Sequence, residues 1–106
     1  MENWTVEFLD ATVESEFESL PAEVRAKTVH ISNLIKEFGL PHIGLPYIRH
    51  VQDKIWEIRA LQGRSLYITA TGRKIIILRF FIKKSNKLPR KELQIALKRA
   101  GEIKNG

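Results

Sequence analysis

The fold of this chain is decided by residues 55–84, which read IWEIRALQGRSLYITATGRKIIILRFFIKK. The segment contains three runs rich in β-branched and aromatic residues, and such runs are typical of β-strands. The runs are Ile55–Ala60, Arg64–Ala70 and Arg73–Lys83. Two short connections separate them, Leu61-Gln62-Gly63 and Thr71-Gly72, and we expect Gly63 to take the positive φ that a tight turn requires. The segment therefore predicts three consecutive antiparallel strands.

The predicted sheet has two faces, because side chains alternate along a strand. We expect one face to be apolar and covered by helices. Its residues are Trp56, Ile58, Leu66, Ile68, Ile76, Leu78, Phe80 and Ile82. We expect the other face to be open to solvent, and its residues are Glu57, Arg59, Ser65, Tyr67, Thr69, Arg79, Phe81 and Lys83. Cations interleaved with aromatic rings suit a single-stranded nucleic acid.

The flanking sequence predicts one further strand and three helices. Residues 3–9 alternate in polarity, as a strand does. Apolar residues recur at helical spacing over residues 11–20 and 22–38, with Asp10 as a capping residue and Gly39 as a stop signal. A last helix begins after Pro89 and ends at Gly101, whereas residues 47–51 form either a short strand or the approach to one.

The element order is therefore β-α-α-β-β-β-α. It predicts one α+β domain over residues 1–106, with an antiparallel sheet, an N-terminal helical hairpin on one face and a C-terminal helix.

Charge is unevenly distributed along the chain, whose net charge is +6. Residues 1–38 hold eight acidic and three basic residues, whereas residues 39–106 hold four acidic and fifteen basic residues. This asymmetry predicts a polyanionic partner for the C-terminal part. The sequence has no cysteine, no signal-peptide pattern and no apolar run long enough to span a bilayer. We therefore expect a cytoplasmic protein with no membrane contact.

Metal and cofactor motifs are missing from the sequence. The three histidines, His30, His42 and His50, lack helical i, i+4 spacing, and neither HExxH nor a glycine-rich phosphate loop occurs. What remains is a set of cations in the predicted strands or at their ends. Arg64 lies either in the strand, with its side chain toward the core, or in the turn, where it can swing outward. Glu57, the sole carboxylate on the predicted open face, is either a partner of Arg59 or Arg79 or a general base.

Three segments carry a resemblance to a known family: PYIRHVQDKIWEIR at 46–59, GRSLYI at 63–68 and IIILRFFIKKSNKLPRKELQIALKRA at 75–100. They resemble the bacterial RelE/ParE superfamily of type II toxins, and their local sequence is most similar to the phage-derived HigB-like branch. The resemblance covers nearly the whole chain and is weakest before Asp10. It implies a RelE-like fold and a toxin that binds the ribosome and cuts mRNA there without a metal or other cofactor. It also implies a cognate antitoxin, often a helix-turn-helix protein, through which alone the toxin reaches operator DNA.

The resemblance also implies site residues. Arg64 matches the arginine that stabilises the scissile phosphate, and Arg59 matches a basic residue on the preceding strand. The general acid and base are not assigned by it, because Glu57 stands where RelE has a lysine and no C-terminal tyrosine matches. The candidate catalytic residues are Arg59, Arg64, Lys84, Glu57 and Tyr67. The candidate RNA-binding residues are His50, Arg73, Arg79, Lys83 and Lys87, and His50 is also a third candidate for proton transfer.

The sequence therefore predicts a ribosome-dependent mRNA endonuclease toxin. The expected reaction is attack of a ribose 2′-OH on the adjacent phosphate, which leaves a 2′,3′-cyclic phosphate. A gyrase inhibitor of the ParE type and a non-enzymatic RNA-binding module are the alternatives.

Overall fold

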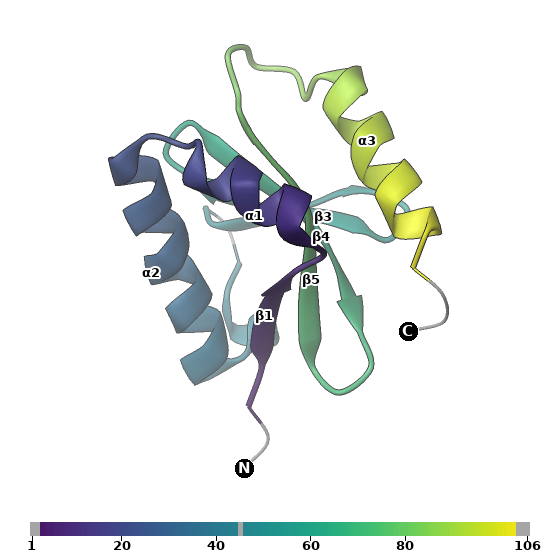
Figure 1. Ribbon diagram of the computed structural model, residues 1–106. Coiled ribbons are helices and arrows are strands. Elements are labelled where there is room, and N and C mark those ends of the chain that lie inside the picture. The colour runs from purple at the N-terminus through teal and green to yellow at the C-terminus, as the bar shows by residue number, and fades with distance from the viewer. Residues whose placement is uncertain (1–2, 45, 104–106) are drawn as a thin grey trace.

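The computed structural model describes residues 3–44 and 46–103, and contains a five-stranded sheet with helices packed against it (Figure 1). The elements follow the predicted order, and the segment before residue 55 also forms a strand. They are β1 (Thr5–Phe8), α1 (Ala11–Glu18), α2 (Ala22–Phe38), the 3₁₀ helix η1 (Leu40–His42), β2 (Ile48–Gln52), β3 (Ile55–Ala60), β4 (Gly63–Ala70), β5 (Lys74–Ile82) and α3 (Arg90–Gly101). No helix in this described part of the chain is long and apolar enough to cross a membrane.

The helix boundaries follow the predicted capping signals. The side chain of Asp10 accepts a hydrogen bond from the Val13 backbone N–H at 3.0 Å, which satisfies a free donor in the first turn of α1. Gly39 ends α2 with φ of +87°, a conformation that glycine adopts without steric cost.

The sheet is mixed rather than wholly antiparallel. Its strand order is β1-β5-β4-β3-β2, and β2 to β5 form an antiparallel meander. The N-terminal strand β1 pairs in parallel with β5, so the prediction of an all-antiparallel sheet is wrong for β1. The two helices that follow β1 carry the chain to the opposite edge of the sheet, and a crossover of this kind permits a parallel pair.

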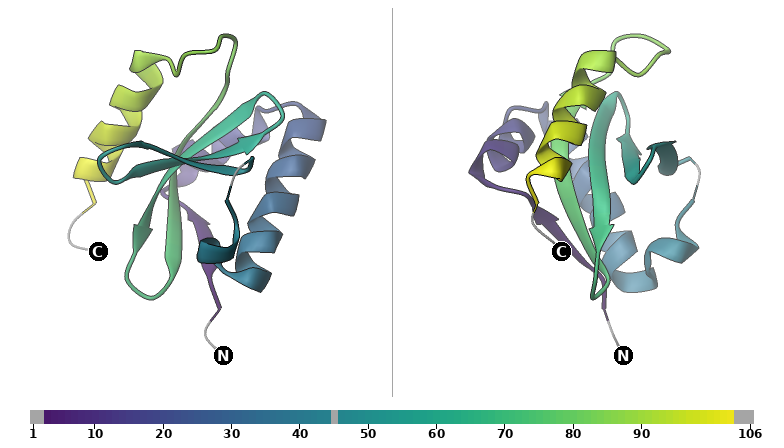
Figure 2. Two further views of the ribbon diagram at one scale, coloured as in Figure 1. Left: turned by 180° about the vertical axis from the view of Figure 1, so that it is seen from behind. Right: turned by 90° about the vertical axis from the view of Figure 1, so that its right-hand side faces the viewer.

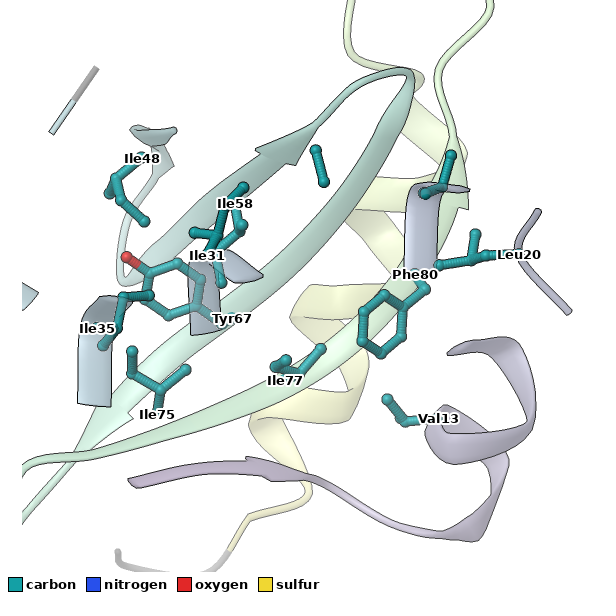
Figure 3. Packing of buried hydrophobic residues seen from close by; sticks show 12 residues of the cluster. Val13, Leu20, Ile31, Ile35, Ile48, Ile58, Tyr67, Ile75, Ile77 and Phe80 are labelled. Atoms are coloured by element: carbon teal, nitrogen blue, oxygen red, sulfur yellow. The ribbon is translucent and has the colours of Figure 1, made fainter. Parts of the chain in front are cut away.

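Both faces of the sheet are covered by helices (Figures 1 and 2). The face under α1 and α2 buries one apolar cluster, which Figure 3 shows from close by. Its buried members are Val13, Leu20, Val24, Ile31, Ile35, Ile48, Ile58, Ala60, Tyr67, Ile75, Ile77 and Phe80. The face under α3 buries a second cluster, which consists of Ile55, Leu66, Leu78, Phe81 and Ala96. The expectation of one open, solvated face is therefore wrong.

The register between β3 and β4 explains why Tyr67 is in the core. Only Leu61 and Gln62 separate the two strands, so Ala60 pairs with Gly63 and Trp56 pairs with Tyr67. Residues directly opposite each other share a face of the sheet. Tyr67 therefore lies on the face of Trp56 and not on the face of Glu57, and its side chain is 0% exposed.

A β-bulge in β5 reverses the alternation a second time. Leu66 pairs with Arg79 while Tyr67 pairs with Ile77, so Leu78 is an extra residue in β5. Beyond the bulge Phe80 points toward α1 and α2, whereas Leu78 packs in the cluster under α3. Simple alternation cannot predict this change, because the bulge adds one residue to one strand only.

Gly63 has a different role from the one predicted. The left-handed residue of the β3–β4 turn is Leu61, with φ of 58°. A Cβ atom on Gly63 would lie 2.3 Å from Cγ1 of Val24. Glycine is therefore required at this position because α2 approaches β4 too closely to leave room for a side chain.

Candidate active site

A basic cavity lies where the β3–β4 turn meets the loop that follows β5. Its volume is about 340 Å³, and its lining includes five cationic residues and, within the described chain, no acidic one. The lining residues are Arg49, Arg59, Leu61, Gln62, Arg64, Lys83, Lys84, Ser85 and Asn86. A concave site of this charge attracts phosphate groups.

Strand register brings the cations together. The short β3–β4 turn sets Arg59 directly opposite Arg64. The Lys83 backbone N–H donates a hydrogen bond of 2.8 Å to the Gln62 carbonyl, which holds the end of β5 beside that turn. Like charges directly opposite each other on a sheet destabilise it, so the Arg59–Arg64 pair favours a bound anion.

Arg64 is nearly buried, at 8% exposure, and its guanidinium folds back over the turn. Its Nη1 donates hydrogen bonds of 2.8 Å to the carbonyls of Leu61 and Gly63. Its Nε is buried and has no hydrogen-bond partner within the described residues. Arg64 thus belongs to β4, and the idea of a side chain swinging freely from the turn is wrong. The turn holds one edge of the guanidinium, which fixes the orientation of the cation in the cavity wall.

Nearby charges act on Arg64. Burial lowers the pKa of Arg64 from its ordinary value; of the neighbouring charges, Glu57 raises the pKa, whereas Arg59 and Arg49 lower it. Arginine nevertheless stays protonated in proteins. A phosphate in the cavity would relieve the mutual repulsion of these arginines.

Glu57 lies in a second cavity that adjoins the first, with a volume of about 480 Å³. Its lining residues are Arg49, His50, Val51, Gln52, Glu57, Lys83, Asn86, Lys87, Leu88, Arg90 and Leu93. Glu57 is 3% exposed, and its Oε1 lies 3.9 Å from Nε of Arg59. The Nε of Arg59 has no hydrogen-bond partner within the described residues, so this contact is a loose ion pair.

Four further predicted residues border one or both of the cavities. Lys83 lines both cavities, Lys84 the first and Lys87 the second. His50 borders the second cavity, but its ring lies edge-on to Trp56 with centroids 4.9 Å apart, and its Nε2 lies 2.7 Å from the Asp53 carbonyl oxygen. Because His50 is opposite Trp56 in the register, its ring lies on the other face of the sheet from Glu57.

Two other predicted residues lie away from these two cavities. Tyr67 is in the core beneath α2, on the opposite face from Glu57. Arg73 is in the β4–β5 turn, at the far end of these strands from Arg64 (Figure 1). The phenol of Tyr67 cannot reach the basic cavity, and Arg73 lines neither of the two cavities described here.

Arg79 links three elements instead of facing solvent. Its Nη1 lies 2.6 Å from Oε2 of Glu16 in α1, and its Nε lies 2.7 Å from Oε1 of Glu92 in α3. Burial alone would lower the pKa of Arg79, but the hydrogen bonds and charges of these two carboxylates raise it above its ordinary value. Arg99 also contacts Glu16, at 2.9 Å. Arg79 is thus committed to holding α1 and α3 against β5.

The structure adds residues that sequence patterns did not select. Arg49 borders both cavities from the edge strand β2, and Arg90 borders the second from the first turn of α3. Asn86 borders both. The only sequence signal for Arg49 was its place next to His50, because the strand that carries it was itself uncertain. Within the described residues, no group of three or more histidine, aspartate or glutamate side chains could hold a metal ion.

Comparison with known proteins identifies the family. Residues 15–101 match the model of the family described as "Phage derived protein Gp49-like". No curated protein matches the chain.

Solved structures of RelE toxins share the fold. A RelBE2 toxin–antitoxin complex from Mycobacterium tuberculosis aligns with a TM-score of 0.60 at 20% identity, covering 80% of this chain and 97% of that one. The archaeal RelE–RelB complex from Pyrococcus horikoshii OT3 aligns with a TM-score of 0.63 at 14% identity, covering 76% of this chain and 96% of that one. A double mutant of E. coli toxin RelE in the free state aligns with a TM-score of 0.59 at 17% identity, covering 92% of this chain and 97% of that one. The chain therefore belongs to the phage-derived Gp49-like family and has the RelE fold, as the resemblance in its sequence predicted.

Proposed function

We propose that this protein is the toxin of a type II toxin–antitoxin system and cuts mRNA on the ribosome, in the cytoplasm. The observation that carries the proposal is the basic cavity, in which Arg64 is fixed by two turn carbonyls beside Arg59, Lys83 and Lys84. A fixed cation aimed at a phosphate stabilises developing charge with little reorganisation. The family match and the RelE fold support the same function.

The proposed reaction is an internal transfer within the RNA. The ribose 2′-oxygen forms a bond to the adjacent phosphorus, and the bond from phosphorus to the 5′-oxygen of the next nucleotide breaks. The proton of the 2′-OH goes to a general base, and a general acid gives a proton to the departing 5′-oxygen. The products are a 2′,3′-cyclic phosphate and a free 5′-OH. The attacking group is already next to the phosphate, so proximity supplies part of the acceleration, and the reaction requires no metal-activated water.

Glu57 is the best remaining candidate for the general base. Tyr67 lies on the other face of the sheet, and His50, although it borders the second cavity, packs its ring against Trp56 on that other face. Glu57 borders the second cavity beside Arg49 and Lys83. A carboxylate there can accept the 2′-OH proton while the cations hold the phosphate. Replacing Glu57 with Gln should lower the cutting rate by about 10²–10⁴.

The test is primer extension on an mRNA translated by bacterial ribosomes. Purified protein that has been dialysed against EDTA should cut an all-ribose message, and it should not cut one with a 2′-deoxy nucleotide just 5′ of the cut. Arg64→Ala should slow cutting by about 10²–10³. Lys91→Ala is the matched control, because Lys91 is exposed on α3 and borders neither cavity.

Cutting of the deoxy message would show that the 2′-OH is not the nucleophile. Intact mRNA combined with inhibited DNA supercoiling would instead identify a gyrase inhibitor and refute the proposal.

We also propose a cognate antitoxin that docks on the acidic hairpin of α1 and α2 and carries the complex to operator DNA. Two of the similar structures are RelE–RelB complexes. Exposed carboxylates are available on the hairpin at Glu14, Glu18 and Glu23, while Glu16 is engaged by Arg79 and Arg99. Co-expression with the neighbouring small reading frame should restore growth and yield a stable complex. Normal growth of a sensitive bacterium that makes this protein alone would contradict the proposal.

A further inference from the structure

A third cavity adjoins the basic cavity at the β3–β4 turn, which lies beside the N-terminal part of α2 (Figure 2). Its volume is about 210 Å³, and it shares Arg59, Leu61 and Arg64 with the basic cavity. The rest of its lining consists of Lys27, Pro46 and Tyr47. Within the described chain, three of these six residues are cationic and none is acidic. The positive surface of the candidate active site therefore continues past the turn and onto α2.

Lys27 brings a cation from the acidic part of the sequence into this surface. Its side chain is half-buried, and its Nζ lies 5.1 Å from the centroid of the Tyr47 ring, within the range of a cation–π contact. Among the described residues, no carboxylate forms an ion pair with Lys27. The Tyr47 carbonyl accepts a hydrogen bond of 2.7 Å from the Arg59 backbone N–H, so the residue that holds Lys27 is tied to β3. Lys27 is thus held in the same cavity wall as Arg59, with its charge available to an external anion.

Leu61 is an apolar residue common to both cavities. It is 55% exposed, which is unusual for a leucine beside so many cations. Lys83 and Lys84 belong to the basic cavity alone, whereas Lys27 belongs to the third cavity alone. A single-stranded nucleic acid presents phosphates with a nucleoside between each pair, and its binding grooves combine cations along the backbone with apolar or aromatic contacts to the bases. Two groups of cations that share an exposed leucine fit that pattern.

We propose that the third cavity binds the RNA phosphate next to the one that is cut, with Lys27 as its cation and the intervening nucleoside against Leu61. This inference rests on the proposed function, because it extends the path of the same RNA strand. An acidic protein segment would also be attracted by three cations. The continuity with the basic cavity through Arg59, Leu61 and Arg64 favours the strand that already occupies that cavity.

Direct binding tests the phosphate contact without requiring RNA cutting. The probe is a labelled single-stranded RNA whose 2′-hydroxyls are methylated, and fluorescence anisotropy on the full chain measures its affinity. Lys27→Met keeps the apolar stem of the side chain and should weaken binding about tenfold, with a log–log salt slope flatter by about 0.7. Lys27→Arg keeps the charge and should bind like the wild type. Lys36→Met is the matched control, because Lys36 is exposed on the same helix and lines neither cavity.

The position of the contact is tested with ribosome-bound messages that carry one uncharged methylphosphonate, placed either just 5′ or just 3′ of the cut linkage. At one of these two positions, the methylphosphonate should slow cutting by the wild type about tenfold and should slow the Lys27→Met protein no further. Additive losses at both positions would overturn the proposal.

The two experiments also separate this site from the cutting function. If the wild type binds RNA through Lys27 but cuts no message, the cutting function fails and the phosphate site stands. If the wild type cuts but Lys27→Met binds RNA as tightly as Lys36→Met, the site is overturned and the function stands. Unchanged RNA affinity in Lys27→Met together with weaker binding of the co-expressed protein partner would assign the cavity to an acidic protein and overturn the proposal.

Discussion

Replacing Gly63 with Ala tests how closely α2 packs against the turn that carries Arg64. The new Cβ would lie 2.3 Å from Cγ1 of Val24 and 3.1 Å from the Ala60 carbonyl oxygen. Val24 is 2% exposed and β-branched, so its side chain cannot rotate away without strain. Overpacking of this kind costs about 1–3 kcal/mol. For a domain of this size, a loss of 2 kcal/mol lowers the melting temperature by roughly 8–16 °C.

The same substitution should also reduce RNA cutting. The Gly63 carbonyl accepts a hydrogen bond from Nη1 of Arg64, so a displaced strand moves the cation that faces the phosphate. Val24→Ala removes the atom that the new methyl group meets. In the double variant, the loss in stability should therefore be smaller than the sum of the two single losses, by about 1 kcal/mol or more. In the double variant, the rate of RNA cutting should recover together with the stability.

Chemical denaturation and primer extension on the four proteins of this cycle give both readouts. Gly101→Ala is the control, because a Cβ there would have no atom within 4 Å. It should be neutral or slightly stabilising, by up to about 1 kcal/mol. Additive losses in the double variant, or a Gly63→Ala protein as stable as the wild type, would refute the argument from close packing.

Three other predictions concern charge. Arg79→Met should lower the free energy of unfolding by on the order of 3 kcal/mol, because it removes the cation paired with Glu92 and leaves Glu16 with Arg99 alone; the urea midpoint measures this, and unchanged stability would contradict it. Lys83→Ala with Lys87→Ala should flatten the log–log salt dependence of RNA affinity by about 0.7 per lost phosphate contact, whereas Lys91→Ala should not. Burial raises the pKa of Tyr67 above its ordinary value of 10.0, so its contribution to stability is complete below pH 10 and is lost as pH rises beyond it. The Tyr67→Phe protein should lose less stability than the wild type in alkaline denaturation.

Local patterns were sufficient for the three α-helices and four of the five strands, but they left β2 open. Strand propensity in residues 55–84 predicted β3, β4 and β5 to within a residue or two, and capping by Asp10 and Gly39 marked the ends of the helices. These features are encoded by neighbours in the chain, so they can be read without knowing the fold. The family resemblance was also visible in contiguous motifs, and the match over residues 15–101 agrees with it.

The assignment of side chains to faces needed the tertiary structure. One register choice at the β3–β4 turn moved Tyr67 into the core, and one extra residue at Leu78 redirected Phe80. Alternation is a local rule, but its phase between strands depends on how each hairpin pairs and where each bulge lies. The predicted open face therefore became an interface with α3.

The residues of the candidate site also divide into those that the sequence could select and those that only the tertiary structure revealed. Arg59 and Arg64 could be selected from the sequence because they flank a turn in one hairpin. Arg49, Arg90 and the ion pairs of Arg79 could not, because each depends on contacts between segments far apart in the chain. Charge composition indicates that a cation is present, but only its neighbours in space decide whether it binds a ligand or holds two helices together.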